Sequence, residues 1–186
     1  MVKCDVEQAR VYITTEKRYT DGNLFGIWME LSKFLKKKDF MQACRELYAD
    51  EDDPVFLFTD WKDIPRHFVS EKQVSVNLFK MIKQVAGLPV TDKMGFMIWL
   101  GKHEHDLPDI RTDDILKVFR MCYQGYFGFR QQFTEYYARE ELGITRQTSP
   151  RFDFTTFNDY LFKDLFVIDC GFVFRKVEYQ HPGIHI

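Results

Sequence analysis

Apolar residues in the first 65 positions change between strand-like and helical spacing over short distances. Arg10–Thr15 and Leu24–Leu31 are rich in the β-branched and aromatic side chains of strands, and Asp21-Gly22 between them is a strong turn signal. Residues 39–49 then repeat apolar side chains at helical spacing, before a third strand-like run at Val55–Thr59. Strands and a helix that alternate this closely predict a ββαβ unit in the first 65 residues, and therefore an α+β fold.

The remaining patterns are mainly helical. The sequence Ser70-Glu-Lys-Gln73 is a capping box, which predicts a helix that ends at Gly87. A β-hairpin is expected at 166–174, turning at Gly171. Further helices are expected over residues 91–100, 112–122, 129–142 and 153–165. With 186 residues, the chain suits one compact domain or two to three very small ones.

A packed core is expected because hydrophobic residues make up 45% of the chain. The four cysteines, at positions 4, 44, 122 and 170, form no Cys-x-x-Cys pair, which favours reduced, buried thiols over a disulfide framework. The sequence starts without an apolar signal-peptide core and contains no apolar run near the ~18 residues of a membrane span. These features predict a cytoplasmic protein without membrane contact.

No complete catalytic motif is present, since the glycine-rich phosphate loop, the Gly-x-Ser-x-Gly elbow and the His-Glu-x-x-His zinc sequence are all missing. His103 with His105, and His181 with His185, are possible metal ligands, but neither pair has two further ligands at a standard spacing. The acidic run Asp50–Asp53 fails the EF-hand pattern, because a proline and a valine follow where a ligand and a glycine are needed. We therefore expect no enzymatic activity, cofactor, bound metal or small-molecule substrate.

The net charge of −2 hides a strongly acidic segment. Between Asp39 and Asp63 there are eight acidic residues against two basic ones, which gives this segment a charge of −6. The run Asp50–Asp53 follows the C-terminal end of the expected helix, where negative charge does not stabilise a helix. A solvated acidic loop and a binding surface both remain possible explanations of the run.

Several segments occur together in an order that chance does not readily produce. They are Arg10-Val-Tyr-Ile13, Gly22-Asn-Leu-Phe-Gly-Ile-Trp-Met-Glu-Leu31, Phe40-Met-Gln-Ala-Cys-Arg-Glu-Leu47, Asp50-Glu-Asp-Asp-Pro-Val-Phe-Leu-Phe-Thr-Asp-Trp61, Tyr123-Gln-Gly-Tyr126, Phe152-Asp-Phe154 and Gly171-Phe-Val-Phe174. In these segments, and over roughly two thirds of the chain, the sequence resembles the ArdA family of antirestriction proteins.

The resemblance implies an elongated protein of three small domains: an α/β unit at 1–65, a helical middle at 66–108 and a C-terminal α/β unit at 109–178, with a tail at 179–186. It also implies a homodimer joined through the C-terminal units, and no cofactor. Members of the family imitate duplex DNA with rows of Asp and Glu and occupy the DNA channel of type I restriction–modification enzymes. The implied partner is therefore a protein, without direct contact to nucleic acid.

On this basis we expect the DNA-imitating surface to contain Glu46, Asp50, Glu51, Asp52, Asp53, Asp60, Asp63, Asp109, Asp113 and Asp114. The residues expected at the two-fold interface are Phe152, Phe154, Phe157, Tyr160, Leu161 and Phe162. These six large apolar groups lie within eleven residues, more than one helix face of a small domain buries.

Two alternatives to a DNA-imitating inhibitor stay open. Family members are usually strongly acidic, whereas this chain has a net charge of −2 and a basic cluster at 33–38, which favours a family-like regulator or partner-binding module without strong DNA mimicry. The other alternative is a nucleic-acid binder, which would use the basic residues Arg66, Lys72, Lys80, Lys83 and Lys93. A continuous negative stripe would favour mimicry, and a positive groove would favour nucleic acid.

Overall fold

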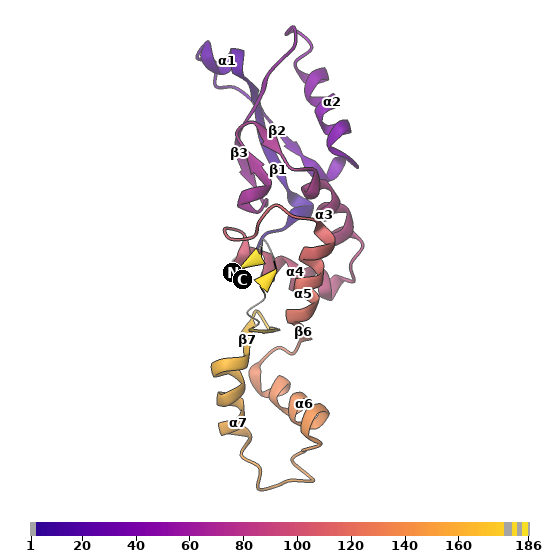
Figure 1. Ribbon diagram of the computed structural model, residues 1–186, viewed down its shortest axis with the longest axis vertical. Helices are drawn as coiled ribbons and strands as arrows, with labels where there is room; N and C mark the ends of the chain where they lie inside the picture. Colours follow the sequence, from indigo (N-terminus) through magenta and orange to yellow (C-terminus); the bar gives the residue numbers. More distant parts are fainter. Residues whose placement is uncertain (1–2, 177–179, 182–183, 186) are drawn as a thin grey trace.

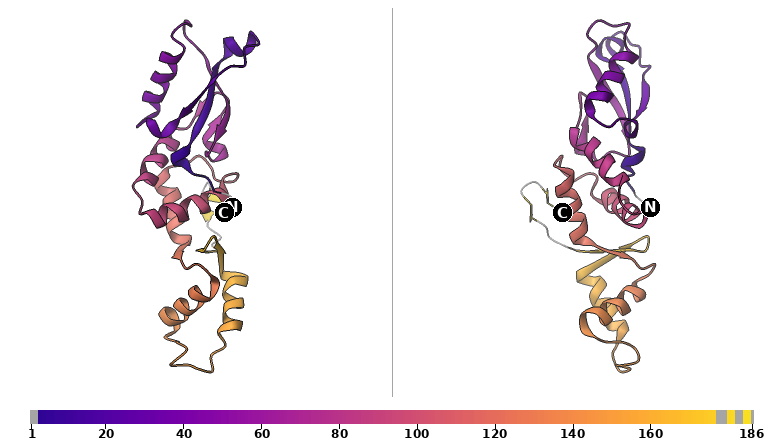
Figure 2. Two further views of the ribbon diagram at one scale, coloured as in Figure 1. Left: turned by 180° about the vertical axis from the view of Figure 1, so that it is seen from behind. Right: turned by 90° about the vertical axis from the view of Figure 1, so that its right-hand side faces the viewer.

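The computed structural model describes residues 3–176, 180–181 and 184–185. The molecule is long and narrow (Figures 1 and 2): residues 10–62 form one end, and residues 130–165 form the other. Helices and small antiparallel sheets alternate along its length, which confirms the predicted α+β class. Within the described residues, no helix is long and apolar enough to cross a membrane.

The N-terminal end is built on a three-stranded sheet in the order β2-β1-β3. The central strand β1 (Arg10–Thr15) pairs antiparallel with β2 (Ile27–Glu30) and with β3 (Phe56–Lys62). Helix α2 (Lys37–Leu47) packs Phe40 and Cys44 against this sheet, as its helical spacing predicts. The turn expected between the first two strands also contains a short helix, α1 (Glu16–Thr20), whose first turn Thr15 caps.

The middle of the molecule is helical, with α3 (Val76–Ala86), α4 (Val90–His103) and α5 (Thr112–Cys122). The capping-box interpretation of Ser70 is wrong. Ser70 instead belongs to a small hairpin of β4 (Val69–Ser70) and β5 (Gln73–Val74), and the cap of α3 is Ser75. A backbone hydrogen bond holds this hairpin against the first sheet and keeps the segment out of a helix, because the amide of Phe58 in β3 donates to the carbonyl of Glu71 at 2.7 Å.

The C-terminal end combines two helices with a second three-stranded sheet. Helix α6 (Arg130–Leu142) ends at Gly143, and α7 (Phe154–Tyr160) continues into a π-helical turn, Leu161–Leu165. The predicted hairpin is confirmed as β7 (Phe166–Asp169) and β8 (Phe172–Arg175). A strand that the sequence patterns did not indicate, β6 (Tyr123–Tyr126), pairs with β8 to give the order β6-β8-β7.

Three short 3₁₀ turns complete the chain up to the middle helices: η1 (Val6–Gln8), η2 (Leu31–Lys33) and η3 (Arg66–Phe68). Beyond the second sheet, β9 (Gln180–His181) pairs with β10 (Ile184–His185). These two strands lie in the segment 179–186 that was expected to be a loose tail. The rest of that segment lies outside the described residues.

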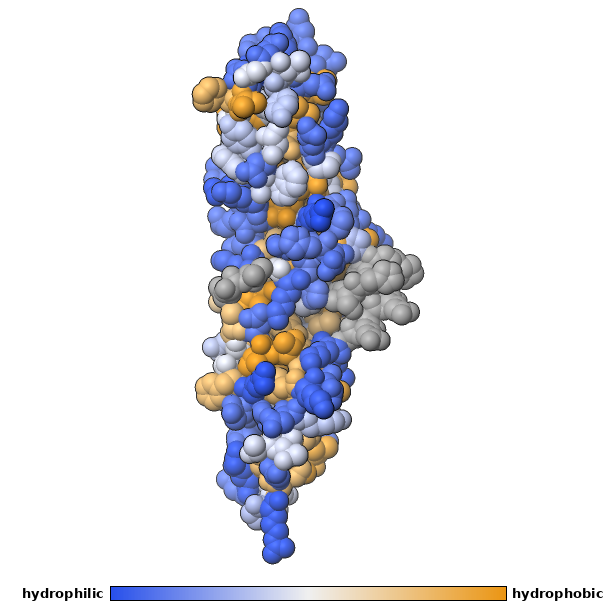
Figure 3. Space-filling view, turned by 90° about the vertical axis from the view of Figure 1, so that its left-hand side faces the viewer, coloured by the Kyte–Doolittle hydropathy of each residue, from blue (hydrophilic) through white to orange (hydrophobic). Residues whose placement is uncertain are grey.

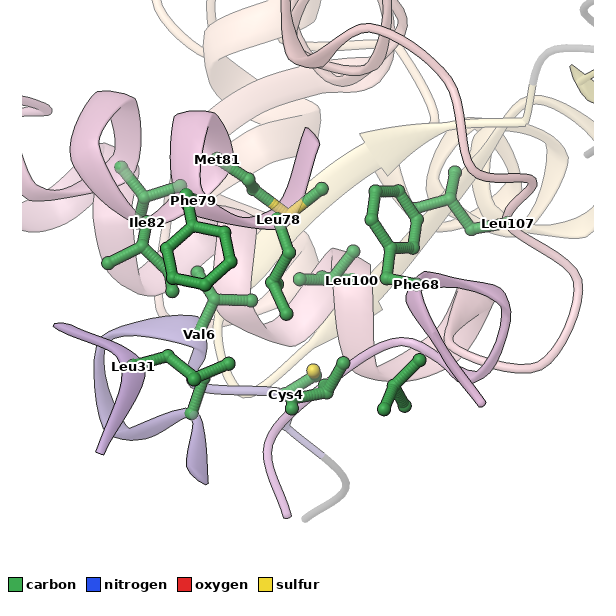
Figure 4. Packing of buried hydrophobic residues seen from close by; sticks show 14 of the residues in the cluster. Cys4, Val6, Leu31, Phe68, Leu78, Phe79, Met81, Ile82, Leu100 and Leu107 are labelled. Carbon is green, nitrogen blue, oxygen red and sulfur yellow. The ribbon is translucent and has the colours of Figure 1, made fainter. Parts of the chain in front are cut away.

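One large core joins all three expected domains. It extends from Cys4 through the middle helices to Phe174. Figure 4 shows how η1 and η2 contribute, because Val6 and Leu31 face Phe79 of α3. A smaller second cluster, centred on Phe133, lies between α6 and the π-helical turn. The domain boundaries at 65 and 108 therefore stay a proposal, since the main core crosses both.

Candidate functional site

The acidic loop after α2 is held by one arginine from the neighbouring helix. The Nε of Arg18 lies 2.7 Å from Glu51 Oε1, and its terminal nitrogen lies 2.7 Å from Asp50 Oδ2. The hydroxyl of Thr15 also donates to Glu51, at 2.9 Å. The Glu51 side chain is only 7% exposed. Glu51 is therefore less exposed than expected, because Arg18 and Thr15 bind its carboxylate within the chain.

The same arginine packs against the core of the N-terminal end. Its guanidinium lies 4.8 Å from the centre of the Tyr48 ring, and the Tyr48 hydroxyl donates to the buried carbonyl of Ile13 at 2.7 Å. The hydrogen bond to Glu51 raises the pKa of Arg18, and burial raises the pKa of Tyr48. Arg18 is thus held in place, and it offsets part of the negative charge of the loop.

Asp52 and Asp53 are exposed and, unlike the exposed Asp50, are not paired with Arg18. Asp53 has a φ of +50°, so the chain turns sharply between the helix and β3. Together with α1, the loop borders a groove of about 430 Å³. The residues that line this groove are Glu16, Lys17, Thr20, Asp21, Glu51, Asp52, Asp53, Pro54 and Val55. With five acidic side chains against one basic side chain, the groove is negative even with Arg18 nearby.

The other expected acidic residues of this end are less concentrated. Glu46 is exposed on α2 and accepts a hydrogen bond from Gln42 at 3.0 Å. Asp60 is exposed on β3. Asp63 is half-buried, adopts a φ of +57° and accepts a hydrogen bond from the backbone amide of Asp5 at 3.1 Å. Asp63 therefore has a local structural role, whereas Glu46 and Asp60 face solvent.

A second acidic group lies where α5 begins beside α3. Asp109 accepts hydrogen bonds from the Ser75 hydroxyl at 2.7 Å and from the Asn77 amide at 2.9 Å. Asp113 accepts one from Gln84 at 2.9 Å, which lowers the pKa of Asp113 together with a bond from Arg111. Asp114, in the same first turn of α5, is half-exposed. The expected acidic residues thus form two groups, one at the N-terminal end and one in the middle.

The six aromatic and aliphatic residues expected at a dimer interface divide in two. Leu161 and Phe162 are 0% and 7% exposed and belong to the second core cluster, so they are not available to a partner. Phe154 is also buried, at 9%, under the guanidinium of Arg146. The expectation is corrected for these three residues, because the C-terminal unit buries them in its own interior.

Phe152, Phe157 and Tyr160 remain accessible. The Phe152 and Phe157 rings lie 5.3 Å apart, and the Phe157 and Tyr160 rings stack at 6.4 Å. Tyr160 is 53% exposed. Phe152 precedes α7, and Phe157 also packs against the second core cluster, so Tyr160 is the most exposed ring of this aromatic row. The exposed edge of the row suits a contact with another molecule.

The structure also places the residues that were weighed as metal ligands. His103 packs its ring against Trp99 at 5.0 Å, and burial lowers its pKa. His105 lies on the surface, 3.3 Å from the carboxylate of Glu104. In the part of the chain that the structure describes, no group of three or more His, Cys, Asp or Glu side chains is arranged to hold a metal ion. The side chains of His181 and His185 lie outside the described residues.

Two apolar surfaces were missed by the sequence interpretation. One lies in the connection between α1 and β2, where Phe25 is 84% exposed. The other is a groove of about 380 Å³ between α4 and the second sheet, lined by Lys3, Thr91, Met94, Met97, Ile98, Tyr126, Cys170 and Phe172. Figure 3 shows one side of the molecule as mainly hydrophilic, with apolar areas near the N-terminal end and in the lower half.

Cys170, which was expected to be buried, is exposed.

Comparison with known families decides the identity of the chain. The family model described as antirestriction protein (ArdA) matches residues 11–174. The chain belongs to the ArdA family. No curated protein shows a significant match to the sequence. The matched range includes all of the expected acidic and interface residues, so both acidic groups and the aromatic row lie in the part shared with the ArdA family.

Proposed function

We propose that this ArdA-family protein imitates duplex DNA and blocks the DNA-binding channel of a type I restriction–modification enzyme. The observation that carries the proposal is the family match over residues 11–174, which covers every candidate acidic residue. In this proposal the chain needs no catalytic group, cofactor, metal or small-molecule substrate. It acts in the cytoplasm, where restriction enzymes meet incoming DNA.

The shape and charge of the molecule support this proposal. A DNA-binding channel is lined with Lys and Arg, and it attracts a negative surface of suitable length. The long, narrow molecule carries one acidic group around Asp52 and Asp53 and another around Asp113 and Asp114. Charges at two separate places along one elongated molecule suit a basic channel better than a compact acidic site would.

We also propose that two copies associate through the C-terminal unit. Phe152, Phe157 and Tyr160 form an aromatic row at the edge of the second core cluster, and a self-complementary contact of this row around a two-fold axis would place an acidic N-terminal end on each side. A dimer of this kind has twice the acidic surface of one chain, because each copy contributes the same acidic groups.

One observation favours the second candidate, a family-like regulator or partner-binding module without strong mimicry. Arg18 pairs with both Asp50 and Glu51, so its single positive charge already offsets one of the four negative charges of the loop within the chain. Such a module would bind another protein through the remaining exposed surface but would compete weakly with DNA.

Cells that carry a type I restriction–modification system separate these two functions. Expression of the chain should raise the survival of unmodified phage to that in cells lacking the nuclease. Unchanged restriction, at protein levels confirmed by immunoblot, would contradict the inhibitor proposal and favour the regulator.

A further inference from the structure

The connection between α1 and β2 exposes large apolar side chains that the fold does not cover. Leu24 is 66% exposed, Phe25 is 84% exposed and Ile27 is 46% exposed, and Tyr19 at the end of α1 is 49% exposed. We call these four residues the apolar tip. Single exposed apolar residues are common, but several in one short connection favour an interaction site.

The apolar tip is presented by a fixed backbone. The amide of Asn23 donates to the carbonyl of Arg18 at 2.9 Å, and the Asn23 side chain accepts from the amide of Phe25 at 3.1 Å. The amide of Gly26 donates to the Tyr12 hydroxyl at 2.7 Å. A Cβ at Gly26 would lie 2.4 Å from the carbonyl oxygen of Ile13, so only glycine allows this approach. Phe25 is therefore held out of the core by the local geometry, and little entropy remains to be lost when it binds.

The charges beside the apolar tip define the chemistry of its partner. Helix α1 provides Tyr19 to the tip and also provides Glu16 and Lys17 to the acidic groove. The groove has five acidic side chains against one basic side chain. A complementary surface must therefore be basic, with an apolar recess next to the basic residues.

We propose that the apolar tip inserts into an apolar recess of the basic DNA channel of the target enzyme, next to the contacts of the acidic groove. This inference rests on the proposed function and adds a contact that the phosphates of DNA do not make. Electrostatic attraction weakens as salt rises, whereas burial of a phenylalanine ring is nearly independent of salt. The tip thus supplies the salt-resistant part of the affinity, which a chain of net charge −2 needs most.

The test compares two variants over a range of salt concentrations. In Leu24→Ser with Phe25→Ser, both altered side chains are more than 60% exposed, so the unfolding midpoint should stay close to that of the parent. We expect at least about 10-fold weaker binding to the purified type I enzyme at every salt concentration, with an unchanged slope of log affinity against log salt. Val90→Ser is the matched control, because Val90 is 74% exposed in a different part of the molecule. It should bind like the parent.

Each other outcome has a defined meaning. If the parent binds the enzyme and the double variant binds equally well, the inference is wrong while the proposed function stands. If the parent does not bind the enzyme at all, the proposed function fails and this inference fails with it. Loss of self-association in the double variant, measured by light scattering, would assign the tip to a second copy and overturn the inference. Binding to phosphatidylcholine vesicles by the parent but not by the double variant would also overturn the inference, in favour of a lipid surface.

Discussion

Replacing both Asp52 and Asp53 by asparagine tests whether the acidic loop contacts the target. Asparagine keeps the size of each side chain and tolerates the positive φ of Asp53. The lining of the groove then changes from five acidic side chains against one basic to three against one, so its charge falls from −4 to −2. Because both residues are exposed and neither forms an ion pair within the described residues, the fold should be unaffected.

The expected magnitude follows from the exposure of these carboxylates. An exposed ion pair contributes about 0.5–1 kcal/mol, so two lost contacts should weaken competition by about 1–2 kcal/mol, or about 5- to 30-fold. This loss of competing affinity should be largest at about 50 mM salt and smaller at about 200 mM, because salt screens the charge contacts that the parent makes. The assay is displacement of labelled duplex DNA from the purified type I enzyme, followed by fluorescence anisotropy.

The matched control is Glu51→Gln in the same loop. Glu51 is bound to Arg18 and Thr15 and is 7% exposed, so this change should lower the free energy of unfolding by about 1 kcal/mol. It also removes one of the five acidic side chains of the groove, so competition should weaken, but less than in the double asparagine variant. Equal competition by the parent and the double asparagine variant at low salt would refute the reasoning. So would a loss of competition in Glu51→Gln as large as that in the double asparagine variant.

The other predictions concern assembly, pH and one turn. Tyr160→Asp should shift the proposed dimer toward monomer in light scattering at tens of micromolar, because a charge then replaces a ring that is 53% exposed on the aromatic row. Burial lowers the pKa of His103 from its ordinary value of 6.5, so below that value the unfolded chain binds more protons than the folded chain. Stability should therefore fall as pH drops from about 6.5 through the folded pKa, and denaturant titrations should show that His103→Gln removes this part of the pH dependence. Gly171 has a φ of +83°, and an added Cβ would lie 2.5 Å from the Tyr126 ring, so Gly171→Ala should cost about 1–3 kcal/mol in the same titrations. A loss below about 0.5 kcal/mol would contradict the geometry of that turn.

Local patterns were sufficient for the elements that depend on neighbours in sequence. The strand at β1, the helix α2 and the hairpin of β7 and β8 all follow from side-chain period and turn residues. The patterns failed where a distant partner decides the structure. The segment around Ser70 has a capping-box sequence, but its backbone pairs within a hairpin that contacts β3. Strand β6 exists because β8, about 50 residues further on, supplies its hydrogen bonds.

The same limit applies to the candidate site. The sequence identifies the acidic run, but the pairing of Glu51 with Arg18 joins residues that are 33 positions apart. It identifies a dense aromatic segment, yet only folding decides that Phe162 packs on Phe133 while Tyr160 faces outward. The sequence predicts a strand that includes Leu24 and Phe25 of the apolar tip, because these residues precede β2 without a polar break. The sequence signal for an exposed apolar surface is the run from Leu24 to Trp28, in which every residue except Gly26 has a large apolar side chain.

The central claim is that the chain occupies the DNA channel of a type I restriction–modification enzyme in place of DNA. The most direct test is equilibrium competition between the unlabelled protein and a labelled duplex for the purified enzyme, repeated at several duplex concentrations. Occupation of the channel predicts complete displacement of the duplex, with an apparent affinity of the protein that falls in proportion to added duplex and weakens as salt rises. A ternary complex of enzyme, duplex and protein would contradict it, because the protein would then bind outside the channel.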